Sequence, residues 1–154
     1  MPNNKVSHTI LSMRPPKIVI DTNILISAML SSRGAAFKLI SLIGKQHFDY
    51  AMSVPLMIEY EDVLKRKNSK ILLSQEAIDN ILDRLCYHAD KREVFYLWRP
   101  YLNDPKDDLL LELAVESNCN SIVTYNLKDF KNIEKFGIEA ITPKVFLQKI
   151  GVIQ

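Results

Sequence analysis

Residues 17–30 read KIVIDTNILISAML. The first five, KIVID, form a short apolar and β-branched run that ends in a carboxylate, which predicts a buried strand. NILISAML follows at once, and its apolar residues have the spacing of an amphipathic helix. A buried strand that passes directly into a helix is the opening unit of an α/β fold.

The same alternation continues along the chain. Strands are expected at 48–53, 121–125 and 138–142. Helices are expected at 35–47, 54–67, 74–86, 105–117 and 144–150, with a short helical turn at 127–133. The run VFYLW at 94–98 fits either a short strand or a buried turn. The pattern predicts a three-layer α/β/α sandwich with a mainly parallel central sheet.

Composition places the chain in the ordinary globular class. It has 154 residues, of which 47% are hydrophobic and 25% charged, as expected for one domain. No apolar run approaches the length of a membrane span, and the start lacks a secretory pattern. Cys86 and Cys119 stand far apart and outside any C-x-x-C motif. We therefore expect a cytoplasmic protein with reduced cysteines and no membrane partner.

The domain is expected to span residues 17–150, after an N-terminal tail at 1–16. Met13 stands just before Pro15 and Pro16 and is a candidate for the true start. The formal net charge is +2, and the tail carries Lys5 and Arg14 without any acid. The remainder is neutral, so the chain as a whole lacks a basic signal for nucleic acid.

Polar residues follow the predicted strands. Ligands of open α/β sheets bind beyond the carboxyl ends of the strands, so these residues are expected to converge. Several converging carboxylates repel one another unless a cation lies between them, and Mg²⁺ accepts one or two carboxylates with several waters. Such an ion assists the hydrolysis of a phosphoester. The residues are Asp21, Thr22, Asn23, Glu59, Asp104, Asp107, Asp108, Asn126 and Asp129.

Each of these residues also has an ordinary structural interpretation. Asp21 can end a strand while Asn23 caps the next helix. Asp104 and Asp107 can be a cap and a first-turn acid that complement the helix dipole. Glu59 can lie on a solvated helix face, and Asn126 can be a turn residue. Their ordered appearance after successive strands favours the functional interpretation of the whole set.

Four segments together resemble the PIN-domain ribonuclease family, in particular its prokaryotic VapC-type members, the toxins of toxin–antitoxin pairs. The resemblance covers residues 17–148. It is carried by IVIDTNILISAML, VPLMIEYEDVL, NDPKDDLLLELAVESNCNSIVTYNLKDF and GIEAITPKVFL. By resemblance, we expect a PIN-like topology and an endoribonuclease that uses Mg²⁺ or Mn²⁺ to hydrolyse phosphodiester bonds of RNA by in-line attack.

The resemblance also implies roles for individual residues. The catalytic acids fall on Asp21, Glu59, Asp107 and Asp129, and the metal ligands on Asp21, Asp107 and Asn126. Many relatives carry Asp where this chain has Asn126, and a neutral amide is a weaker ligand, so one or two metals remain possible. Auxiliary roles fall on Thr22, Asn23, Asp104, Asp108 and Thr124.

Partners and alternatives complete the expectations. Lys128 and Lys131 lie next to the predicted site and are candidate contacts for the RNA backbone. Relatives are often dimers inhibited by a small antitoxin, so both partners are expected here by resemblance. The alternative is a catalytically weak PIN-like module that binds RNA or protein, which Asn126 favours. A phosphoacceptor receiver domain ranks last, because strand 121–125 ends without an Asp.

Overall fold

The computed structural model describes residues 14–66, 70–95 and 100–154. Within them a five-stranded sheet has the order β3-β2-β1-β4-β5, and every pair of neighbouring strands is parallel. The strands are β1 (Lys17–Ile20), β2 (Asp49–Met52), β3 (Asp90–Lys91), β4 (Ser121–Val123) and β5 (Glu139–Ile141). The predicted parallel sheet is therefore confirmed.

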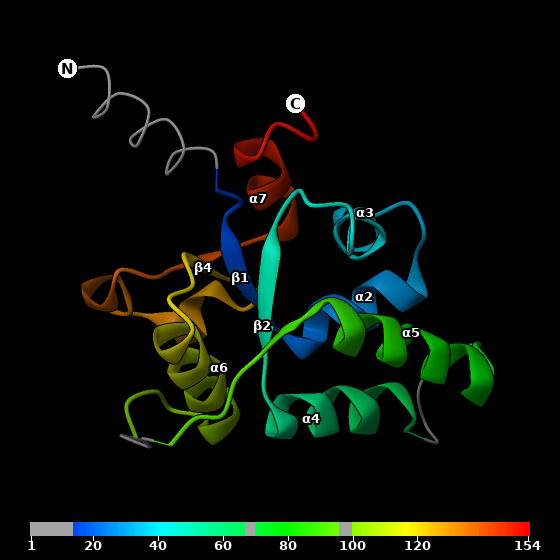
Figure 1. The fold of residues 1–154 in the computed structure, drawn as a ribbon, viewed down its shortest axis with the longest axis horizontal. Helices are drawn as coiled ribbons and strands as arrows, with labels where there is room; N and C mark the ends of the chain where they lie inside the picture. The colour runs from blue at the N-terminus through cyan, green and yellow to red at the C-terminus, as the bar shows by residue number, and fades with distance from the viewer. Residues whose placement is uncertain (1–13, 67–69, 96–99) are drawn as a thin grey trace.

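Helices cover both faces of this sheet. Figure 1 shows α6 on one side of β1 and β2, and α2, α3 and α5 on the other. The helices are α2 (Thr22–Leu30), α3 (Ala35–Ser41), α4 (Val54–Leu64), α5 (Gln75–His88), α6 (Pro105–Glu116) and α7 (Pro143–Lys149), with 3₁₀ turns η1 (Leu127–Phe130) and η2 (Glu134–Phe136). The arrangement confirms the three-layer α/β/α architecture.

Short-range capping explains where most helices begin. The side chains of Ser53, Ser74, Asp104 and Thr142 each accept a hydrogen bond from the backbone of the following first turn. In α4, α6 and α7 a proline also occupies the first turn, where no N–H partner is needed. These starts are the ones that the sequence predicted.

Some local predictions need correction, among them the helix expected at 54–67, which ends at Leu64, and the strand expected at 121–125, which ends at Val123. The helix expected at 35–47 ends at Ser41, because a run of turns with left-handed residues at Gly44 (φ +84°) and Gln46 (φ +66°) follows it. The strand β3 at Asp90–Lys91 was not predicted. Residues 94–95 are irregular, and the rest of the ambiguous run 94–98 lies outside the described residues, as does most of the expected tail 1–16, including Met13.

The core joins the sheet to both helical layers. Ile18, Val19, Ile122 and Val123 are completely buried in β1 and β4, and Leu111 of α6 packs in the same core at 0% exposure. Burial of this extent fixes the central strands, so the residues that directly follow them have defined positions.

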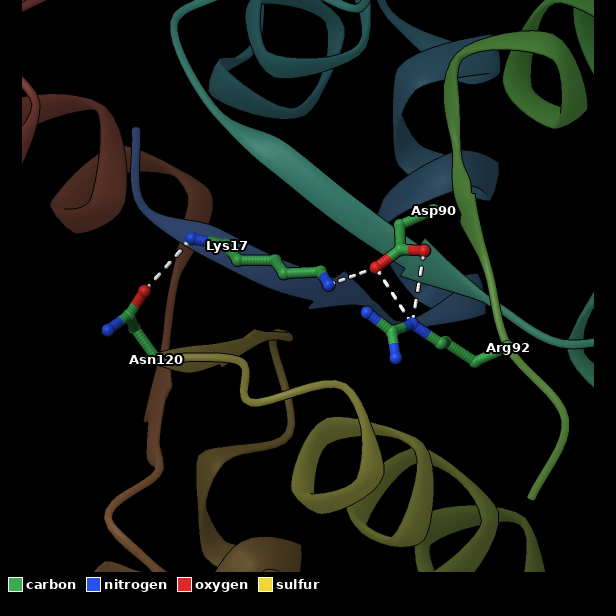
Figure 2. Close-up of polar contacts among 4 residues, drawn as sticks. All are labelled: Lys17, Asp90, Arg92 and Asn120. Carbon is green, nitrogen blue, oxygen red and sulfur yellow. Dashed lines mark hydrogen bonds and ion pairs between the residues drawn. The ribbon is translucent and has the colours of Figure 1, made fainter. Parts of the chain in front are cut away.

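A charged network links the start of β1 to β3 across the intervening β2 (Figure 2). Lys17 Nζ donates to Asp90 Oδ2, and Arg92 Nε lies 3.1 and 3.0 Å from the two Asp90 oxygens. Burial alone would raise the pKa of Asp90, but the hydrogen bonds from Lys17 and Arg92 outweigh it and the pKa is lowered. The network orients Arg92 in the segment that follows β3.

No single described helix is long and apolar enough to cross a bilayer. Only α2 and α3 taken together have the length and apolar composition of a span, and their axes differ by 102°. Four residues of this pair lie in the protein core: Ile24, Leu25, Ala36 and Leu39.

Candidate active site

Asp21 lies at the point where the strand order reverses. The chain leaves β1 first for β2 and later returns to β4 on the other side of β1, which makes the gap between β1 and β4 a topological switch point. Asp21 follows β1, and its backbone N–H donates to the carbonyl oxygen of Val123 in β4 at 3.0 Å. Its side chain is only 7% exposed, and it occupies the N-cap position of α2 without capping that helix.

Two hydroxyl groups hold the Asp21 carboxylate instead. Thr124 Oγ1 donates to Asp21 Oδ2 at 2.8 Å, and Thr22 Oγ1 donates to Asp21 Oδ1 at 3.3 Å. Burial raises the pKa of Asp21, and these hydrogen bonds partly offset the rise. The carboxylate is therefore oriented by its neighbours.

Thr124 is the centre of a wider hydrogen-bond network. It is completely buried, and its Oγ1 accepts from the backbone N–H of Asn126 at 3.0 Å and from Asn23 Nδ2 at 3.4 Å. The structure thus brings Thr22, Asn23 and Thr124, to which the resemblance gave auxiliary roles, together around Asp21.

Tyr60 is a positioning residue that sequence reasoning missed. It is 1% exposed on α4, and its hydroxyl donates to the backbone carbonyl of Ile20, directly before Asp21. Burial, together with the nearby charge of Asp21, raises its pKa well above the usual value, so the hydroxyl stays a donor. The available signal was its place on the inward side of α4, between Leu56 and Leu64.

The acidic residues lie close enough to Asp107 to change its pKa. Its pKa is raised to about 7, first by burial and then by the charges of Asp21, Asp104, Asp129 and Asp108. Asp104 also caps α6 by accepting from the Lys106 N–H at 2.9 Å, so its structural interpretation holds as well. Carboxylates at the end of β1, at the start of α6 and in η1 therefore share one electrostatic environment.

Glu59 stands at the border of this group. Its Oε1 lies 3.1 Å from Lys106 Nζ, an ion pair between α4 and the first turn of α6. Its charge is not among the four that raise the pKa of Asp107 most. The structure therefore brings together the other predicted acids, but it pairs Glu59 with a lysine.

Asp108 points into the protein. It is 1% exposed, and its Oδ1 accepts hydrogen bonds from the backbone N–H groups of Tyr101 (3.2 Å) and Leu102 (2.8 Å). Its Oδ2 is buried and has no hydrogen-bond partner among the described residues. This geometry assigns Asp108 to anchoring the segment before α6.

Replacing Asp108 with alanine is expected to lower the free energy of unfolding by about 2 kcal/mol, because two backbone donors lose a charged acceptor. The melting temperature should fall by roughly 4–8 °C for a chain of this size. Asp108→Asn keeps an acceptor oxygen and should lose less than half as much. Thermal unfolding of both variants checks this, and equal losses would contradict it.

The donor set fits a hard divalent cation. Asp21 and Asp107 supply carboxylate oxygens and Asn126 an amide oxygen, all at the carboxyl edge of the sheet. Among the described residues, no group of three or more His, Cys, Asp or Glu side chains forms a ready-made metal cage. Mg²⁺ commonly takes one or two carboxylates and keeps several waters, so the set is compatible with it.

Two exposed lysines lie beside this edge. Lys128 belongs to η1, which also carries Asp129, and Lys131 directly follows it. Their position next to the acids is the one predicted, and their contact with RNA stays a prediction.

The fold and the site define a class: a three-layer α/β/α domain with an acidic site at the switch point of a parallel sheet. The family model of the PIN domain matches residues 17–128. The chain belongs to the PIN-domain family, and PIN domains are generally nucleases. The predicted family is therefore confirmed.

A solved structure supports the fold. The chain is similar to a chain in the crystal structure of VapBC2 from Rickettsia felis bound to a DNA fragment from their promoter. The two chains are 21% identical, the match covers 80% of this chain and 98% of that one, and the TM-score is 0.55. No curated protein matches the chain in sequence.

Proposed function

We propose that the protein is an endoribonuclease that depends on Mg²⁺ or Mn²⁺ and hydrolyses phosphodiester bonds of RNA. The observation that carries the proposal is the gathering of Asp21, Asp104 and Asp129 around Asp107, whose pKa is raised to about 7 first by burial and then by these charges. An acidic group of this kind in a PIN domain is suited to a divalent cation and a phosphate substrate.

The chain's own residues supply orientation and proton transfer. Asp21, Asp107 and Asn126 would hold the cation, with Thr124 and Thr22 fixing the Asp21 carboxylate. When bound, the cation offsets the repulsion among the acids and stabilises charge that develops on the phosphate. Oxygen atoms of Asp21 or Asp107 that do not hold the cation would orient the attacking water and accept its proton, and the proposal places Glu59 and Asp129 beside them.

The direct test is a panel of single-stranded RNAs with Mg²⁺, with Mn²⁺ and with EDTA. We expect cleavage with either metal and none with EDTA. Mg²⁺ should raise the melting temperature by several degrees at pH 8 and by less at pH 5.5, because protons compete with the metal for Asp107. Cleavage that persists in EDTA, or no cleavage and no metal-induced stabilisation, would overturn the proposal.

The second candidate is a catalytically weak PIN-like module that binds RNA or a protein. Asn126 favours it, because an amide stands where a carboxylate would bind a metal more strongly. RNA binding that is the same with Mg²⁺ and EDTA, without cleavage of any RNA, would support this alternative.

We further propose that the protein is a cytoplasmic toxin, that a small antitoxin protein inhibits it, and that it forms a homodimer. The support is the family and the similarity to a chain of VapBC2. Expression of the chain alone should arrest growth, whereas the Asp107→Asn variant at equal level should not. Light scattering of the purified chain measures the oligomeric state.

A further inference from the structure

A cavity of about 590 Å³ lies between the start of α4, the segment after β3 and the first turn of α6. Its volume is within the range of sites that bind small organic groups. Most of its lining is apolar and includes Val54, Pro55, Val94, Phe95 and Leu109. None of these residues belongs to the acidic site described above.

The cavity adjoins the acidic site. Pro105 and Lys106 line it and share the first turn of α6 with Asp107. Lys106 also contacts Glu59 at 3.1 Å, so one side chain borders both places. A substrate strand that is bound at the acidic site can therefore reach the cavity with its neighbouring nucleotide.

The apolar wall is unusually exposed. Phe95 is 83% exposed and Val54 is 71% exposed, although both are large apolar side chains at the rim of a cavity. Exposed apolar surface of this kind, bordered by polar groups, is typical of a binding site. The phenyl ring offers a flat face to a planar ligand.

Polar groups at the same cavity complement an anionic ligand with a polar edge. The side chain of Lys106 is 61% exposed, so its ion pair with Glu59 is weak, and the Arg92 side chain is held in place by Asp90 (Figure 2). Glu93 adds an acceptor to the lining, and the Ser53 hydroxyl, whose oxygen already caps α4, adds a donor. A flat apolar surface, two cations, an acceptor and a donor together match the ring, the phosphate and the amino groups of a nucleotide.

We propose that this cavity is a nucleobase subsite for the RNA substrate. A base near the scissile bond stacks on Phe95, and Lys106 and Arg92 bind the adjoining phosphate. The inference rests on the proposed nuclease function and adds that one nucleotide position beside the cut is read by the protein.

The test combines abasic substitutions in an RNA that the protein cleaves with substitutions at the cavity. Binding is measured in EDTA by fluorescence anisotropy, and kcat and KM are measured with Mg²⁺. In the wild-type protein, removing one particular base should weaken binding about tenfold. Phe95→Ala should weaken binding of the intact RNA about tenfold, mainly through KM, and should make removal of that base nearly without further effect.

Matched variants separate stacking from unfolding. Phe95→Trp should retain the base effect, and Tyr87→Ala removes an equally exposed aromatic side chain (79%) from α5, away from the cavity, and should behave as wild type. Val54→Asp places a carboxylate in the first turn of α4, which the helix dipole favours, so this variant should fold and bind RNA more weakly.

The outcomes distinguish the subsite from the function itself. Suppose that the wild-type protein cleaves RNA, but that removing each base weakens binding equally in the wild-type protein and in Phe95→Ala. The subsite is then wrong, and the nuclease function stands. If the wild-type protein neither binds nor cleaves any RNA of the panel, both proposals fail. A loss of binding that Tyr87→Ala shares equally would also overturn the subsite.

Discussion

Replacing Asp21 with asparagine is expected to lower the rate of RNA cleavage by at least about a thousandfold. Asparagine is neutral and weakens the site for a divalent cation, but its amide oxygen can still accept the hydrogen bond from Thr124 that holds Asp21 at 2.8 Å. The fold should therefore survive while the chemistry is lost. Single-turnover cleavage with Mg²⁺ measures the rate.

Asp83→Asn is the matched control for this variant. Asp83 is exposed on α5, outside the acidic site. Its replacement by asparagine removes the same charge as Asp21→Asn, so the cleavage rate of the variant should stay within twofold of wild type. A thermal melt of Asp21→Asn within a few degrees of wild type would show that the loss is chemical. Cleavage above a tenth of the wild-type rate would remove Asp21 from the catalytic set.

Asp107→Asn is expected to abolish cleavage to the same extent and, without metal, to make the protein more stable at pH 8. The pKa of Asp107 is raised from 3.8 to about 7, so the ionised form is unfavourable in the folded protein. At full weight this shift corresponds to about 4 kcal/mol. Because the side chain is partly exposed, solvent screening reduces the expected gain to about 1–2 kcal/mol.

The pH dependence has a definite sign. A raised carboxyl pKa favours the folded wild type below the unfolded pKa of about 4, and this advantage is lost as the pH rises through about 7. The difference in the free energy of unfolding between Asp107→Asn and wild type should therefore be at its full size at pH 8. At pH 4.5 it should be less than half as large. Urea unfolding in EDTA at both pH values checks this. A variant less stable than wild type at pH 8 would contradict the repulsion among the acids.

The fold could be predicted largely from local patterns. The run KIVI forms β1 and the capped, proline-started segments form α4, α6 and α7 because each carries its own signal within a few residues. The strand β3, Asp90–Lys91, has no such signal: it is two charged residues long and exists because β2 offers a free edge and Lys17 and Arg92 hold Asp90.

The candidate site divides in the same way. Asp21 could be predicted because it directly follows an apolar strand, and parallel strands end at one edge, whereas Thr124 was expected only from the family resemblance. Asp107 and Asp108 are neighbours of identical type, and only the family resemblance separated them, as a catalytic and an auxiliary acid. Successive residues of a helix point in different directions. In α6, Asp107 therefore faces the other acids, and Asp108 faces the backbone of Tyr101 and Leu102.

The sequence by itself determined the class of fold, the family and the set of acids, because strand and helix signals are local and the order of strands decides which residues share an edge. Only the tertiary structure decided which groups act on one another. It paired Glu59 with Lys106, placed Tyr60 behind Asp21, raised the pKa of Asp107 and opened the cavity at Phe95. These features depend on distances across elements and on burial, which no spacing along the chain contains.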